Sequence, residues 1–193
     1  YYLKSPAEMY AAFPECEDAV VRTQQIADLV DIDLELGKRH FPTYALPKEK
    51  SAGDYLRELC LQGLLERYAG DEQMVSSGQL VPHILERLDR ELDVINRLGF
   101  ANYFLIVWDF VRYARENDIP ATARGSGVGA LVCYSLYLSH VCPIKFDLLF
   151  ERFLDENRLE APDIDIDFCK ERRTTIMRYV KDKYGEQNVA QIG

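Results

Sequence analysis

Residues 162–169 place acidic and apolar side chains in strict alternation, in the order Pro-Asp-Ile-Asp-Ile-Asp-Phe-Cys. This period of two is typical of a β-strand, so Asp163, Asp165 and Asp167 are expected to share one face. Aspartate is uncommon in strands, and three carboxylates on one face repel each other unless their charge is compensated. A divalent cation would turn this repulsion into coordination, which makes the aspartates candidate metal ligands.

Two other interpretations of the acidic strand need consideration. A solvated edge strand with a charged outer face has the same pattern, because charges protect strand edges from pairing. A calcium loop of the EF-hand type requires glycine at its sixth position and glutamate at its twelfth. Counted from Asp163, those positions hold Phe168 and Thr174, so this calcium loop is excluded.

A glycine-rich stretch, Arg-Gly-Ser-Gly-Val-Gly over residues 124–129, precedes an apolar run over residues 131–138. Glycines let the backbone approach a ligand closely, and the start of a helix offers free N–H groups. Ser126 adds a hydroxyl donor and Arg124 a positive charge, so the stretch predicts a triphosphate-binding loop. It matches neither a Walker A motif nor GxGxxG. A glycine-rich turn that lets two helices pack closely is the alternative.

The two motifs complement each other chemically. The glycine-serine loop would hold a triphosphate, and the aspartates would hold the metal ions that bridge it. Two divalent ions about 3.5–4 Å apart activate an attacking hydroxyl and neutralise a leaving pyrophosphate. Such hard cations require oxygen ligands, which aspartate supplies and lysine or histidine does not. The combination predicts transfer of a nucleotide from a triphosphate.

Composition sets wider limits. The 193 residues are 48% hydrophobic, enough for a buried core, and their net charge of −9 argues against a basic nucleic-acid clamp. Five scattered cysteines without a CxxC pair indicate neither a zinc site nor disulfides, as in a cytosolic protein. The longest apolar run, residues 103–111, is interrupted by Asp109 and is too short to cross a membrane. Because the first residue is Tyr1 and not Met, we expect a piece of a longer chain.

Amphipathic helices are expected to position both motifs. Ser5 and Glu8 form a capping box, with Pro6 at the first helical position, which predicts a helix to about residue 13. Apolar spacing predicts further helices over residues 14–30, 51–68, 81–98, 100–116, 131–138, 143–154 and 170–184, with a polar loop over 71–79. The last helix is rich in lysine and arginine, which either contact phosphates or form a solvated face. The predicted class is α/β, mostly helical with a small mixed sheet.

Four segments, taken in order, resemble the alpha subunits of bacterial DNA polymerase III, the C-family replicative DNA polymerases. They are residues 99–107, residues 124–127, Leu-Phe-Glu-Arg-Phe-Leu at residues 149–154, and residues 162–168. The resemblance covers nearly the whole chain. It implies that residues 1–13 are a linker following a PHP domain. Residues 14–193 would be the N-terminal part of a palm similar to the polymerase-beta nucleotidyltransferase fold.

The resemblance also assigns roles to single residues. Asp163 and Asp165 match the family's aspartates that ligate two catalytic Mg²⁺ ions, while Asp167 would have a supporting role. Contacts of the family's Gly-Ser loop to the phosphates of the incoming nucleotide carry over to Gly125 and Ser126. Arg124 and Arg152 are expected as further phosphate partners. The family's third catalytic aspartate is expected beyond residue 193, so this part alone is expected to be inactive.

The implied activity is template-directed transfer of deoxynucleotides to a primer 3′ hydroxyl. The implied partners are primer-template DNA and deoxynucleoside triphosphates, with a sliding clamp and other replicase subunits bound by other regions. No membrane is implied, and the cytoplasm is the expected location. Thr122-Ala123 departs from the family's usual Gly-Pro-Gly by one residue, so the loop entry is expected to differ in shape. A non-templated nucleotidyltransferase and a non-catalytic helical interaction module remain as alternatives.

Overall fold

The computed structural model describes residues 2–33, 42–155 and 162–190. The chain divides into two compact units, Tyr1–His40 and Phe41–Gly193. The predicted boundary after residue 13, between a linker and a palm, stays a prediction. Both motifs identified in the sequence belong to the second unit.

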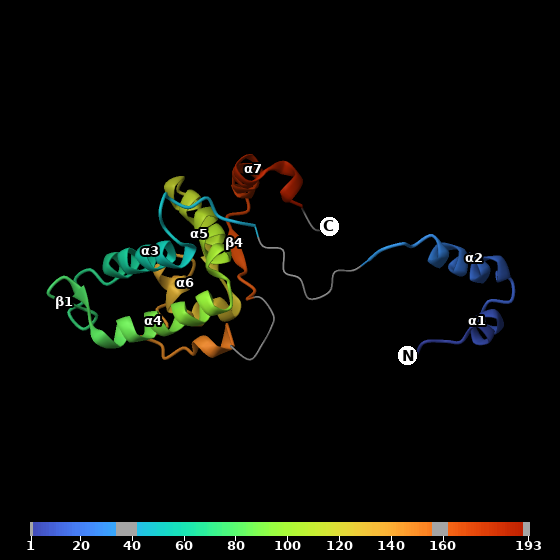
Figure 1. Cartoon of the computed structure of the whole chain (residues 1–193), viewed down its shortest axis with the longest axis horizontal. Helices are drawn as coiled ribbons and strands as arrows, with labels where there is room; N and C mark the ends of the chain where they lie inside the picture. The colour runs from blue at the N-terminus through green and yellow to red at the C-terminus, as the bar shows by residue number, and fades with distance from the viewer. Residues whose placement is uncertain (1, 34–41, 156–161, 191–193) are drawn as a thin grey trace. The chain divides into compact units, whose positions relative to one another are not determined.

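The first unit contains two short helices, α1 (Pro6–Ala12) and α2 (Glu17–Asp28) (Figure 1). The predicted capping box of α1 is confirmed, since the side chains of Ser5 and Glu8 each bond the other's backbone N–H. The second helix begins at Glu17 and not at Pro14, because residues 14 and 15 form a turn. Neither helix has a buried residue.

In the described part of the second unit, the helices α3 (Ala52–Arg67), α4 (Pro82–Arg97), α5 (Ala101–Glu116) and the short α6 (Leu131–Ser135) form the body. The predictions for the first three are confirmed to within one or two residues. α6 lies between α3 and α4 (Figure 1). Gly63 permits this contact, since a Cβ atom there would lie 2.0 Å from the carbonyl oxygen of Ser135.

The strands form two separate two-stranded antiparallel sheets. β1 (Val75–Ser76) pairs with β2 (Gln79–Leu80), and β3 (Ala121–Ala123) pairs with β4 (Ile166–Phe168). The mostly helical α/β class is confirmed, but these two sheets replace the expected mixed one among the described residues. The first hairpin lies where a polar loop was predicted. Its turn residues Ser77 and Gly78 both have positive φ, the conformation that tight hairpins require.

The predicted helix over residues 143–154 is wrong. This segment consists of turns and the short 3-10 helix η2 (Phe150–Arg152). Its apolar residues do not form one buried stripe, because Phe146 and Leu149 are exposed while Phe150, Phe153 and Leu154 are buried. Helical spacing of apolar residues alone therefore gave a false signal here.

Helix α5 has a largely apolar sequence and lies within the core. Phe104, Leu105 and Val111 are fully buried, as is the carboxylate of Asp109. Among the described residues, no single helix is long and apolar enough to cross a membrane. α4 and α5 pass that test only as a pair, and they are bent by 114° relative to each other.

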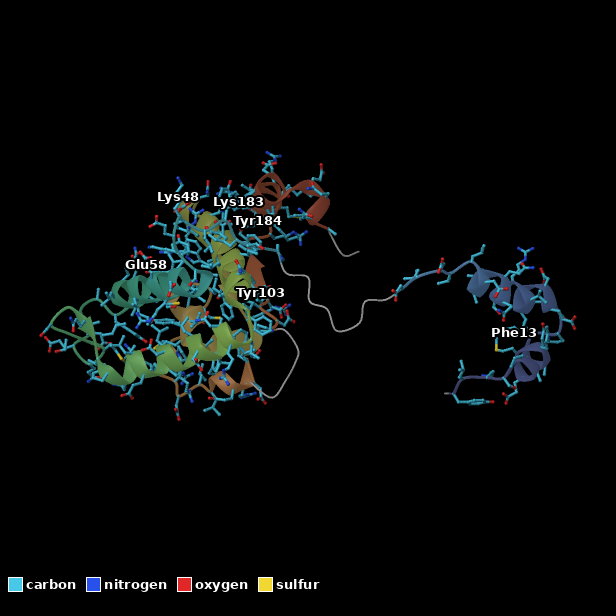
Figure 2. All side chains as sticks on the ribbon, viewed as in Figure 1. Phe13, Lys48, Glu58, Tyr103, Lys183 and Tyr184 are labelled. Atoms are coloured by element: carbon cyan, nitrogen blue, oxygen red, sulfur yellow. The ribbon has the colours of Figure 1, made fainter. Side chains whose placement is uncertain are left out.

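The buried Asp109 joins α5 to α7 (Arg173–Tyr184). Its carboxylate accepts hydrogen bonds from Lys183 (2.7 Å), Tyr179 (2.8 Å) and Tyr184 (3.0 Å) of α7. Arg112 of α5 donates a further bond at 2.9 Å. Lys183 and Tyr184 lie together at this contact (Figure 2). Since α7 follows β4, this cluster fixes the segment next to the acidic strand.

Candidate functional site

The pairing of β3 with β4 brings the two motifs together. Its register sets Thr122 opposite Asp167 and Ala123 opposite Ile166. One residue further on, the backbone N–H of Arg124 donates to the carbonyl oxygen of Asp165 at 3.1 Å. The glycine-serine loop thus begins beside the acidic segment, although about forty residues separate them in the chain.

The acidic segment has the predicted alternation of faces. Asp163, Asp165 and Asp167 are exposed, whereas Ile164 between them is buried. Only the end of the predicted strand pairs as β4, because Asp163 and Asp165 precede Ile166, where the ladder begins. The extended backbone upstream is enough to keep the three carboxylates on one side.

Tyr103 of α5 supports the unpaired part of this segment. Its hydroxyl accepts the backbone N–H of Ile164, between the two candidate ligands, at 3.3 Å. Burial raises the pKa of Tyr103, and the nearby negative charge of Asp163 raises it further, against the opposing effect of the Ile164 bond. Figure 2 shows Tyr103 on the side of the unit where β4 lies. Nothing local in the sequence predicts this partner for Tyr103.

Arg124, predicted to contact phosphate, lies on the acidic face. Its Nη2 is 3.8 Å from Oδ2 of Asp165, and its Nε is 3.6 Å from Oδ1 of Asp167. All three side chains are about half exposed or more. Ion pairs this exposed contribute little stability, so the guanidinium can change partners at low cost.

The other predicted phosphate-binding residues line one pocket of about 490 Å³. Gly125 and Ser126 come from the 3-10 helix η1 (Gly125–Gly129), and Arg152 comes from η2. All three are exposed. The positive φ of Gly125 (68°) explains why glycine occupies the first position of this turn. The pocket is lined by Gly125, Ser126, Val128, Gly129, Asp147, Leu148, Leu149 and Arg152.

One predicted feature of this site is wrong. The N-terminus of the helix after the loop was expected to offer free N–H groups to a triphosphate. In the structure, the N–H groups of Leu131 and Val132 at the start of α6 each donate to the buried carboxylate of Glu91, at 3.0 Å. These two donors are occupied and are not free for a ligand.

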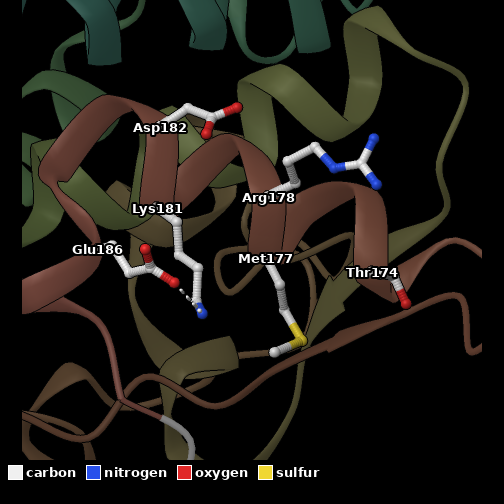
Figure 3. A pocket seen from close by; sticks show the side chains of 6 residues that line it. All are labelled: Thr174, Met177, Arg178, Lys181, Asp182 and Glu186. Atoms are coloured by element: carbon white, nitrogen blue, oxygen red, sulfur yellow. Dashed lines mark hydrogen bonds and ion pairs between the residues drawn. The ribbon is translucent and has the colours of Figure 1, made fainter.

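Some of the lysine and arginine side chains of the basic helix α7 form ion pairs and others do not. Lys183 binds Asp109, and Lys181 points to Glu186 at 3.4 Å (Figure 3). Arg173 and Arg178 of α7, and Lys170 in the turn before it, are exposed and form no ion pair within the described residues. The small pocket on this helix (Figure 3) contains none of the predicted site residues. Both interpretations of the helix, phosphate contact and solvated face, remain open.

The donor set of the acidic segment suits magnesium. Within the described ranges, no group of three or more His, Cys, Asp or Glu side chains is arranged to enclose a metal ion. Magnesium does not require such a cage, since it keeps several waters and binds one or two carboxylates together with substrate phosphates. Asp163 and Asp165 provide two exposed carboxylates beside the candidate phosphate pocket.

Comparison with known proteins shows the family of the chain. A family model described as the bacterial DNA polymerase III alpha NTPase domain matches residues 54–193. The chain belongs to this family. The DNA polymerase III alpha match includes the glycine-serine loop, the pocket and the acidic segment.

Relatives named DNA polymerase III subunit alpha match the chain over nearly its whole length. The protein from Halalkalibacterium halodurans is 47% identical over 193 residues, which is 100% of this chain. The protein from Bacillus subtilis is 43% identical over 98% of the chain, and that from Pseudomonas aeruginosa is 42% identical over 99%. The chain spans only 16% of the length of each of these relatives.

Proposed function

We propose that this chain provides part of the nucleotidyl-transfer site of a DNA-directed DNA polymerase. The observation that carries the proposal is the bond from the Arg124 N–H to the Asp165 carbonyl, which joins the phosphate loop to the acidic segment. Membership of the DNA polymerase III alpha family supports deoxynucleoside triphosphates and primer-template DNA as substrates. We further propose that residues 14–193 belong to a palm of the nucleotidyltransferase type, with residues 1–13 as the linker before it.

In this proposal each motif has a separate task. Asp163 and Asp165 would hold two Mg²⁺ ions, which when bound supply charge neutralisation at the reacting phosphate. Ser126 and the backbone of Gly125 would donate hydrogen bonds to phosphate oxygens, and Arg152 would approach from the other wall of the pocket. Arg124 would move from the Asp165 and Asp167 carboxylates to a phosphate when the nucleotide binds.

The remaining partners belong to the whole protein. A sliding clamp and further replicase subunits would bind regions outside this chain, and the activity would take place in the cytoplasm. Non-templated transfer is the rival activity, because the same loop and aspartates would serve it equally well.

Primer extension by the full-length protein tests the proposal. Asp163→Asn and Asp165→Asn each remove a charged metal ligand, so extension should fall by about 100-fold or more. Asp167→Asn is the matched comparison on the same face and should stay within about tenfold of wild type. Extension near the wild-type rate in Asp163→Asn or Asp165→Asn would contradict the metal assignment. Incorporation that persists without a template would favour the rival activity.

A further inference from the structure

Helix α4 contains a buried ion pair between Arg87 and Glu91. Arg87 and Glu91 lie one turn apart, with Nε of Arg87 2.6 Å from Oε1 of Glu91. The Glu91 side chain is fully buried, and that of Arg87 is 16% exposed. Burying two charges costs several kcal/mol of desolvation, which is offset only when further hydrogen bonds satisfy both groups. The partners that satisfy this pair lie on other segments.

Both oxygens of Glu91 are directed at the segment that follows the glycine-serine loop. They accept the N–H groups of Leu131 and Val132, each at 3.0 Å. The C-terminal end of the loop is therefore fixed to α4. Burial raises the pKa of Glu91, and the two N–H groups and Arg87 oppose that rise.

Arg87 joins the two walls of the candidate phosphate pocket. Its Nη2 donates to the carbonyl oxygens of Gly129 and Leu148, each at 3.0 Å. Gly129 ends η1, which carries Ser126, while Leu148 lies just before η2, which carries Arg152. The walls are already in close contact, because a Cβ atom on Gly129 would lie 2.7 Å from the carbonyl oxygen of Leu149.

We propose that Arg87 and Glu91 are positioning residues that set the separation of these two walls, and so hold Ser126 and Arg152 at the spacing that binds the nucleotide's phosphates. Neither side chain lines the pocket itself. The inference rests on the proposed function, and it adds two residues of α4 that act on the nucleotide only through the backbone they hold.

Single-turnover nucleotide incorporation by the full-length protein on primer-template DNA tests this role. Arg87→Gln removes the guanidinium that bridges the two carbonyl oxygens. The Kd for the deoxynucleoside triphosphate should rise by about tenfold or more, while the maximal rate stays within about threefold of wild type. Arg87→Lys keeps the positive charge beside Glu91 but loses the planar guanidinium with its several N–H donors. Its nucleotide Kd should therefore lie between those of the wild type and Arg87→Gln.

The control is Arg57→Gln, which breaks the exposed pair between Arg57 of α3 and Asp89 of α4. Its Kd should stay within about twofold of wild type, since exposed pairs contribute little. Gly129→Ala is the second test variant, because its Cβ pushes the same walls apart with Arg87 intact, and it should raise the Kd in the same way. If Arg87→Gln does not fold, the Kd of Gly129→Ala tests whether the separation of the two walls sets nucleotide affinity.

A wild-type nucleotide Kd in folded Arg87→Gln or Gly129→Ala would overturn the inference. If the Tm falls while the Kd stays unchanged, the pair is purely structural. Failure of the proposed function is a separate result. It would appear as undiminished primer extension by Asp163→Asn and Asp165→Asn, whatever nucleotide Kd the Arg87 variants have.

Discussion

Asp163 and Asp165 keep their carboxylates exposed, while Ile164 between them is only 9% exposed. The alternation in the sequence predicted these faces, because successive side chains of an extended chain point to opposite sides. It did not predict that Tyr103 would hold the Ile164 N–H or that Arg124 would lie beside Asp165. Those contacts depend on segments about 40 to 60 residues away, which no local pattern encodes.

The cysteines allow a prediction for single residues. All five are free thiols, but Cys60 and Cys133 are fully buried and Cys16 is exposed. Burial raises the pKa of Cys60 to about 12 and also raises that of Cys133, so little thiolate is present at pH 8. In the native chain, iodoacetamide should alkylate Cys16 about 100-fold faster than Cys60 or Cys133. Mass spectrometry of the labelled peptides measures this ratio, and equal rates in folded protein would contradict the burial.

Whole elements were predicted well where the apolar period was long. The 16-residue helices α3, α4 and α5 were predicted to within one residue at each end, although of these three only α3 begins with a side-chain cap, where Ser51 accepts the Asp54 N–H at 3.1 Å. The shorter segment 143–154 had a similar spacing, but the exposed Phe146 and Leu149 show that this spacing was accidental. The length of the apolar period was therefore a better guide than spacing alone.

The contact between α3 and α6 gives a prediction at this scale. Gly63→Ala would place a methyl group 2.0 Å from the Ser135 carbonyl oxygen, which forces the helices apart. The free energy of unfolding should fall by about 2–3 kcal/mol, as in other overpacked cores. Gly53→Ala in the same helix meets only the side-chain end of Asn96, which can rotate, so its effect should stay below about 1 kcal/mol. Urea unfolding of the two variants compares them, and equal stabilities would argue against the close contact.

In the second unit as a whole, the Asp109 cluster connects the core helix α5 with α7 at the end of the described chain. Burial by itself raises the pKa of Asp109, but hydrogen bonds from Lys183, Arg112 and Tyr179 outweigh it. The pKa therefore lies below its ordinary value of 3.8. A depressed folded-state pKa means that the stabilisation is present above the unfolded value and is lost as the pH falls through the folded value.

The prediction is a pH-dependent effect of Asp109→Asn. At pH 7 the variant should lose about 3 kcal/mol, because Lys183 keeps its charge without its carboxylate partner Asp109, while Arg112 keeps only its pair with Glu116. The stability difference from wild type should shrink as the pH falls below 3.8 toward the lower folded-state pKa of Asp109. The wild-type carboxyl then becomes protonated and is as uncharged as the asparagine. Thermal unfolding of both chains between pH 7 and about pH 2.5 measures this difference. Asp93→Asn, whose side chain is 74% exposed, is the control. A difference that stays constant down to the lowest pH would contradict the assignment.

The sequence by itself determined which local features the chain has. These are the alternating carboxylates, the glycine-serine loop, the helices with long apolar periods and the family that the motifs resemble. These features are local, because a strand or helix period and a cap involve residues a few positions apart. Only the tertiary structure decided how they meet. It set Arg124 beside Asp165, and it gave the N–H groups at the start of α6 to Glu91, some forty residues earlier in the chain. A buried N–H must find an acceptor, and which acceptor it finds depends on the packing of α4 against the loop.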